Sequence, residues 1–139
     1  MNPSTSGRAP STKRAIVVLI QLAIASLHAL RCGRRLDGEW ARLYSSYFSD
    51  LVIPFGVYFL LTLNEDYIPL FRSWSGKAGA VIVLTTAAEV AQFFGFDVLG
   101  VTFDPLDILM YASGTLLAAL LDVQVFPRLV KGWNLPARL

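Results

Sequence analysis

Charged residues are scarce in this sequence. Asp, Glu, Lys and Arg make up 16% of the 139 residues, whereas apolar types make up 55%. A soluble domain carries about a quarter charged residues, so the composition argues against a soluble protein and indicates a membrane protein. The length suits one domain and is too short for two.

Cysteine and histidine are nearly absent, with Cys32 and His28 as the single representatives of each type. An internal disulfide and a Cys/His metal centre are therefore excluded. The sequence has no nucleophile or cofactor motif, so we expect no cofactor, and whether the protein is an enzyme stays open. The Lys and Arg residues form only small groups beside apolar segments, which is typical of membrane topology signals and not of a nucleic-acid partner.

Four apolar segments predict the fold. We expect an all-α integral membrane bundle of four transmembrane helices, because a span needs about 20 largely apolar residues. The predicted helices cover residues 13–30, 47–63, 78–96 and 105–126. Together they form a membrane domain over residues 13–126. A disordered, Ser/Pro/Gly-rich tail precedes it at residues 1–12, and a C-terminal tail follows at residues 127–139.

The first half of the chain allows alternatives. Residues 13–30 have a basic start and could be a removable signal peptide. Their apolar core of 16 residues is long for one, and no small-x-small cleavage site follows. We therefore interpret the segment as a retained span. The polar stretch after it could contain a short interfacial helix between the first two spans, and Pro54 is expected to kink the second span.

The distribution of positive charge predicts the orientation. With four spans, both termini lie on the same side of the membrane as the loop between the second and third helices. That side carries eight Lys and Arg residues, against four on the other side. The positive-inside rule therefore predicts that both termini are cytoplasmic.

Acidic residues gather at the opposite face in this topology. Asp50 lies in the first turn of the second predicted helix, and Glu89 lies roughly 10 Å deep in the third at 1.5 Å per residue. A spacing of three residues places Glu89 and Gln92 on one helix face. Asp104 and Asp107, also three apart, open the fourth helix. The predicted ligand-binding residues of this acidic pocket are Glu89, Gln92, Asp104, Asp107, Asp50 and Tyr111.

Structural roles compete with function for some of these acids. Asp104 precedes a proline and suits an N-cap, while Asp107 complements the positive end of the helix dipole. Asp50 could likewise be an early-helix acid. Glu89 is different because it lies inside a span and away from a cap, where an ionisable residue costs several kcal/mol unless it is paired or hydrated. Glu89 is therefore the strongest candidate for a functional residue.

Small residues on the last two predicted helices indicate how these helices pack. The third helix carries Ala87, Ala91 and Gly95, and the fourth carries Gly114 and Ala118. Small side chains allow membrane helices to approach closely. We therefore expect tight packing of the third helix on the fourth, with the acidic pocket at the end of this pair.

The order of these polar residues resembles the pattern of the VanZ-like family, small multi-helix membrane proteins named for a teicoplanin-resistance factor. In that pattern an Asp begins one span, Glu-x-x-Gln lies near the end of the next, and Asp-x-x-Asp opens the last, followed by a Gly. The matching residues are Asp50, Glu89, Gln92, Asp104, Asp107 and Gly114. The resemblance covers residues 46–122 and implies an envelope protein whose members raise glycopeptide tolerance. It does not supply a reaction.

Two departures from the family pattern concern the last span. The family usually has an Arg in the loop before the Asp pair, where this chain has the residues LGVTF. It also usually has an Asn four residues after the second Asp, where this chain has Tyr111. If that Arg neutralises the acids in relatives, Arg34, Arg35 or His28 would have to replace it here.

The favoured function is ligand binding. The acidic pocket would accept a cationic or hydrogen-bonding group of a membrane lipid, a lipid-linked ligand or a lipophilic compound. One alternative is a membrane-embedded enzyme that acts on a lipid-linked substrate through carboxylate acid/base or divalent-metal chemistry. A proton- or cation-coupled carrier and a structural partner subunit of a membrane complex are further alternatives. A homodimer or a larger membrane complex is compatible with each of them.

Overall fold

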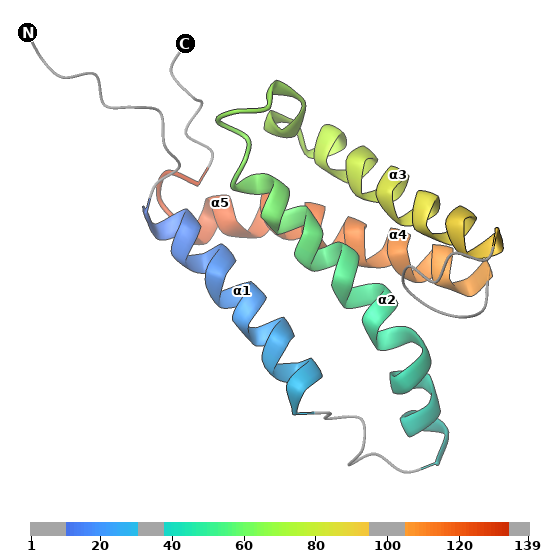
Figure 1. Ribbon diagram of the computed structural model, residues 1–139. Coiled ribbons are helices and arrows are strands. Elements are labelled where there is room, and N and C mark those ends of the chain that lie inside the picture. Colours follow the sequence, from blue (N-terminus) through green and yellow to red (C-terminus); the bar gives the residue numbers. More distant parts are fainter. Residues whose placement is uncertain (1–10, 31–37, 95–104, 134–139) are drawn as a thin grey trace, which may run out of the picture.

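The chain folds into helices joined by turns. The computed structural model describes residues 11–30, 38–94 and 105–133, and within these ranges there is no strand. The long helices are α1 (Ser11–Ala29), α2 (Gly38–Thr62), α3 (Trp74–Phe93) and α4 (Pro105–Leu120). The shorter elements are η2 (Pro69–Arg72), the π-helical turn η3 (Leu121–Val125) and α5 (Phe126–Leu129). The predicted all-α fold is confirmed (Figure 1).

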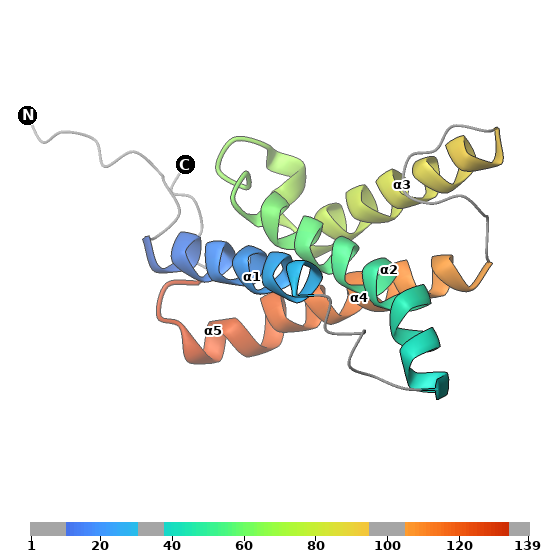
Figure 2. The same ribbon diagram turned by 60° about the horizontal axis from the view of Figure 1, so that its bottom comes forward.

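α2 is the central helix of the arrangement. It contacts α1, α3 and α4, and its contacts with α4 are the most extensive between any two described elements. The start of α1, the end of α2, the start of α3 and the α5 helix gather at one end, hereafter the α5 end (Figures 1 and 2). The buried apolar core contains Val17, Tyr58, Phe59, Val81, Ala118, Ala119 and Trp133.

α2 is longer at its start than the sequence predicted. It begins at Gly38, whose φ of +67° glycine adopts without strain, and not at Tyr47. The expected separate interfacial helix is therefore wrong for residues 38–46, which form the first turns of α2 itself. Figure 2 shows these turns inclined to the rest of the helix. Pro54 lies inside α2 and cannot donate to the carbonyl of Asp50, which weakens the helix where the kink was expected.

The C-terminal part of the chain is more structured than predicted. The last helix was expected to end at residue 126 and a tail to begin at residue 127. The helical path instead continues from α4 through η3 and α5 to Leu129, and a turn then buries the Trp133 side chain to 1% exposure. An indole that is buried this deeply contributes substantially to the core, so residues up to 133 belong to the folded domain.

Two of the described helical segments are long and apolar enough to cross a membrane. They are Thr12–Ala29 and Leu106–Leu129, and the second runs from α4 through α5. α2 offers a shorter apolar segment, Tyr47–Thr62, and α3 does not meet the same measure of length and hydropathy. Length and composition therefore support two spans out of the four that the sequence predicted.

The small residues of α4 serve a different neighbour from the one expected. A Cβ atom added at Gly114 would lie 2.0 Å from the carbonyl oxygen of Leu51, which belongs to α2. The close approach that Gly114 permits is thus between α4 and α2. Ala87, which was expected to face the fourth helix, is exposed. The prediction of an especially tight α3–α4 pair is wrong on these two points, and Gly95 lies outside the described residues.

The contact at Gly114 leads to a stability prediction. Gly114→Ala places a methyl group against the Leu51 backbone, which cannot rotate away, so α2 and α4 must separate. We expect the free energy of unfolding to fall by about 1–3 kcal/mol, measured by chemical denaturation of the detergent-solubilised protein.

The matched control is Gly79→Ala, because an added Cβ atom at Gly79 meets nothing within 4 Å. This change removes a helix-weakening glycine and should leave stability unchanged or raise it by up to about 1 kcal/mol. Equal effects of the two substitutions would contradict the close α2–α4 contact.

Candidate functional site

Glu89 lies in the interior of the bundle, between α3 and α4. The Tyr111 hydroxyl donates a hydrogen bond of 2.6 Å to Glu89 Oε1, and the exposed fractions are 2% for Glu89 and 4% for Tyr111. The second carboxylate oxygen, Oε2, is buried and has no hydrogen-bond partner among the residues that the structure describes. A buried acceptor without a donor costs about 1–3 kcal/mol, so Glu89 has an unmet requirement for a donor.

Two further acids lie close to this pair. Asp107 lies one helical turn before Tyr111 on α4, and Asp50 precedes Leu51, whose carbonyl meets α4 at Gly114. Both side chains are half-buried. The structure therefore places acids of α2, α3 and α4 in one region of the bundle, and Asp50, Glu89, Asp107 and Tyr111 are referred to below as the acidic cluster.

The interpretation of Asp50 as an early-helix acid is wrong. Because α2 begins at Gly38, Asp50 lies three turns inside the helix. The favourable effect of the helix dipole on an acid is limited to the first turn. Asp50 therefore has no capping role, and its place inside α2 needs another explanation. Asp107 does lie in the first turn of α4, so the dipole and a role at the site both apply to it.

The other predicted site residues have different outcomes. Gln92 lies near the end of α3, three residues beyond Glu89, and is half-buried. The hydrogen-bond donor that the structure gives Glu89 is Tyr111 and not Gln92. Asp104 lies outside the described residues, so its role stays a prediction. Within the described ranges, no group of three or more His, Cys, Asp and Glu side chains is placed to hold a metal ion.

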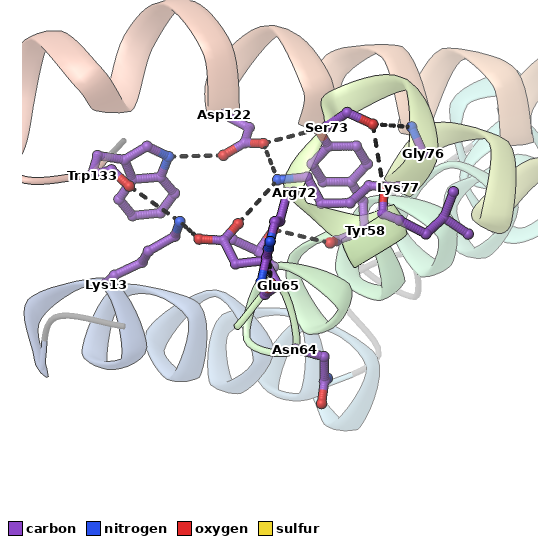
Figure 3. Close-up of polar contacts among 12 residues, drawn as sticks. Lys13, Tyr58, Asn64, Glu65, Arg72, Ser73, Gly76, Lys77, Asp122 and Trp133 are labelled. Atoms are coloured by element: carbon purple, nitrogen blue, oxygen red, sulfur yellow. Dashed lines mark hydrogen bonds and ion pairs between the residues drawn. The ribbon is translucent and has the colours of Figure 1, made fainter. Parts of the chain in front are cut away.

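A second set of charged residues lies at the α5 end (Figure 3). Lys13, at the start of α1, forms an ion pair with Glu65, and a Glu65 oxygen also lies 3.5 Å from Lys77 Nζ. Lys77, at the start of α3, donates a hydrogen bond of 2.5 Å to Asp122 Oδ2 in η3. Positive and negative charges thus alternate along Lys13, Glu65, Lys77 and Asp122, referred to below as the four-charge network.

Neutral donors complete the environment of Asp122. The Tyr58 hydroxyl donates to Asp122 Oδ2 at 2.9 Å, and the Trp133 indole donates to Oδ1 at 2.8 Å. Lys13 also donates to the Trp133 carbonyl oxygen at 3.1 Å and lies 5.1 Å from the Trp133 ring centroid, a cation–π contact. Both oxygens of Asp122 are therefore satisfied, and the two positive and two negative charges of the network cancel.

One face of α3 joins the two sets. Lys77, Val81, Thr85 and Glu89 follow each other at intervals of four and are all buried, as expected for a single helix face. Lys77 and Glu89 are twelve residues apart, which is about 18 Å at 1.5 Å per residue. This distance prevents Lys77 from neutralising Glu89, so the acidic cluster and the four-charge network are separate sites.

Sequence reasoning missed the four-charge network. Lys13 and Lys77 are among the basic residues that were interpreted as topology signals, and Glu65 and Asp122 were not among the predicted site residues. A signal was nevertheless present, because the apolar helices leave few polar residues and Lys77 lies on the same α3 face as Glu89. The identity of the partners could not be predicted, because it depends on how the end of α2, η3 and the turn at Trp133 pack together.

The network leads to a second stability prediction. Lys77→Met removes the charge that lies between Glu65 and Asp122 and leaves the buried Asp122 and the partly buried Glu65 with one remaining lysine. Breaking a buried pair from one side costs about 3–5 kcal/mol, which we expect as a loss in the free energy of unfolding. Lys131→Met is the matched control, because Lys131 is exposed and its loss should change stability by less than about 0.5 kcal/mol. Equal losses would show that the network contributes nothing.

No protein-family model matches the chain, and neither the curated proteins nor the solved structures contain a match. The resemblance to the VanZ-like family therefore rests on the residue pattern alone and stays a prediction. Function is argued from the geometry of the site.

Proposed function

We propose that this chain is an integral membrane protein whose acidic cluster binds the cationic or hydrogen-bond-donating group of a lipid, a lipid-linked compound or a lipophilic ligand. The observation that carries the proposal is the Glu89 carboxylate, which is buried, is held by Tyr111 through one oxygen and lacks a donor on the other among the described residues. A ligand that donates to Oε2 would supply the missing hydrogen bond.

The exposed apolar surface supports a membrane location. Only 11% of the apolar window Thr12–Ala29 is buried inside the protein, and Val18, Leu19 and Leu22 are exposed. In water, an apolar helix of a folded domain would bury such a face. Val83 and Leu84 on α3 are exposed as well. Contact of these side chains with lipid explains the pattern, because a bilayer imposes no cost on apolar surface.

The contrast between the two polar sites supports ligand binding at the acidic cluster. The four-charge network has equal numbers of positive and negative charges, and Asp122 has a donor on each oxygen. It needs no further group. The acidic cluster carries three carboxylates in one region of the bundle, and Oε2 of Glu89 has no donor among the described residues; a cation is the group that such a set attracts most strongly.

The ligand's expected chemistry follows from the position of the cluster. An ammonium or guanidinium group would interact with Glu89, Asp50 and Asp107, while an apolar body would lie among the lipid-facing side chains. The resemblance to the VanZ-like family adds the expectation that the ligand belongs to the cell envelope and that its binding affects glycopeptide tolerance. In this proposal both termini are cytoplasmic, the protein lies in the plasma membrane, and the acidic cluster is near the outer face.

A pair of simple amphiphiles tests the proposal. Dodecylamine carries an ammonium group and dodecanol a neutral hydroxyl, so both can donate to Glu89 Oε2, but dodecylamine should raise the melting temperature of the protein in a neutral detergent more strongly because its hydrogen bond is charge-assisted. Glu89→Gln replaces a charged acceptor by a neutral amide. A charge-assisted hydrogen bond contributes about 1.5–3 kcal/mol, so we expect the apparent affinity for dodecylamine to fall by a factor on the order of 10 to 100.

The control variant is Glu39→Gln, an exposed acid in the first turn of α2, which should bind dodecylamine as the unchanged protein does. Failure of both amphiphiles to stabilise the protein, or full binding of dodecylamine by Glu89→Gln, would refute the proposal. A parallel titration with Mg²⁺ addresses the enzyme alternative, since stabilisation by Mg²⁺ that disappears in Glu89→Gln would favour divalent-metal chemistry at the same carboxylates.

A further inference from the structure

The α5 end buries two of its lysines and exposes most of its other basic residues. Lys13 and Lys77 are buried and neutralised by Glu65 and Asp122. The positive charges that reach the surface near the four-charge network belong to other residues. They are Arg14, Arg72, Arg128 and Lys131, of which Arg14 is half-buried and the rest are exposed. One further acid, the half-buried Asp66, lies at this end, so the accessible charge is clearly positive.

Contacts of the four-charge network place these cations around one end of the bundle. Arg14 follows Lys13, and the Arg72 guanidinium donates to the Glu65 carbonyl oxygen at 3.3 Å. Lys131 lies two residues before Trp133, whose carbonyl oxygen accepts a hydrogen bond from Lys13. The close-up in Figure 3 shows Lys13, Glu65, Arg72 and Trp133 around the same network. Segments that are distant in the sequence therefore carry these positive charges at the same end of the bundle.

Apolar and aromatic side chains are interleaved with these cations. Tyr67, Ile68, Leu70 and Trp74 in the segment between α2 and α3 are exposed, and Leu129 next to Arg128 is 74% exposed. A surface that binds a soluble acidic protein or free anions has no need of exposed leucines. Arginines among aromatic and aliphatic residues are typical of the interface between the headgroups and the acyl chains of a bilayer.

We propose that the α5 end is a binding surface for the phosphate groups of anionic phospholipids. Arg72, Arg128 and Lys131 contact the headgroups, while Tyr67, Trp74 and Leu129 lie at the boundary with the acyl chains. Arginine suits this task because its planar guanidinium binds phosphate through two parallel hydrogen bonds and stays charged at all relevant pH values. The four-charge network contributes by removing both interior lysines from the surface charge and by fixing the segments that carry the arginines.

This surface is distinct from the acidic cluster in place and in charge. It lies at the opposite end of α3 from Glu89, and it selects anionic and not cationic partners. The proposal goes beyond the proposed function, and each of the two can fail without the other. A protein that binds anionic lipid at the α5 end but ignores dodecylamine would retain this inference and lose the previous one.

The test compares two lipids that differ in headgroup charge. The full-length protein in a neutral detergent is titrated with phosphatidylglycerol or phosphatidylcholine of the same acyl chains, and bound lipid is counted by native mass spectrometry. Each basic residue near a membrane surface contributes about fivefold to the affinity for anionic lipid. We therefore expect a triple variant, Arg72→Gln, Arg128→Gln and Lys131→Gln, to bind phosphatidylglycerol on the order of a hundredfold more weakly, with unchanged binding of phosphatidylcholine.

Two controls make the result specific. Arg72→Lys with Arg128→Lys keeps the charge and should retain a preference for phosphatidylglycerol, and Glu89→Gln should bind phosphatidylglycerol as the unchanged protein does. Inorganic phosphate added at equal concentration should not compete, since it lacks the acyl chains. Equal affinity for the two lipids, or an undiminished preference in the triple variant with native helicity by circular dichroism, would overturn the proposal. Binding of an acidic peptide by a protein that does not bind phosphatidylglycerol would also overturn the proposal and would assign the surface to a protein partner.

Discussion

The buried pairing of Lys77 with Asp122 and Glu65 is the interaction on which the arrangement of helices depends most. Charges that leave water lose several kcal/mol of solvation each, and only close partners of opposite sign recover this cost. The members of the four-charge network come from the start of α1, the turn after α2, the start of α3 and the end of the α4 path. These four segments can therefore satisfy their charges only when they lie together, which specifies one packing of the α5 end.

The same rule explains why the opposite end differs. Val81 and Ala118 are fully buried between the two polar sites, and they separate the interior charges along the bundle. No lysine of the network can reach Glu89 across a distance of about 18 Å. The α5 end is therefore held by its own ion pairs, whereas Glu89 receives a hydrogen bond from Tyr111 on one oxygen, and α2 and α4 approach closely at Gly114. The two polar sites thus differ in how completely the described residues satisfy their buried carboxylates, since Asp122 has a donor on each oxygen and Glu89 on one.

The sequence predicted the helices well and their partners poorly. Hydropathy and the N-cap at Ser73 depend on local residues, so the existence of the long helices follows from the sequence. Residues 38–46 are polar, and their helical structure depends on continuity with the rest of α2, which local hydropathy does not reveal. The depth of Glu89 was predictable from its position in an apolar run. Its bond to Tyr111 was not, because it depends on how α3 is rotated against α4.

This chain has Tyr111 at the position where the VanZ-like pattern usually has an Asn. A phenol donates one hydrogen bond and reaches further than an amide, and here it reaches across from α4 to Glu89. The substitution therefore keeps a donor for the carboxylate while leaving its second oxygen for another group.

The Arg that the family usually has before the Asp pair has no counterpart in the LGVTF stretch. Among the described residues, the candidate replacement is His28, but its ring nitrogens interact with the Ile24 carbonyl and the Ser49 hydroxyl. A positive charge for Glu89 would come from a basic residue whose side chain lies outside the described part of the chain, such as Arg34 or Arg35, or, in the proposed function, from a ligand.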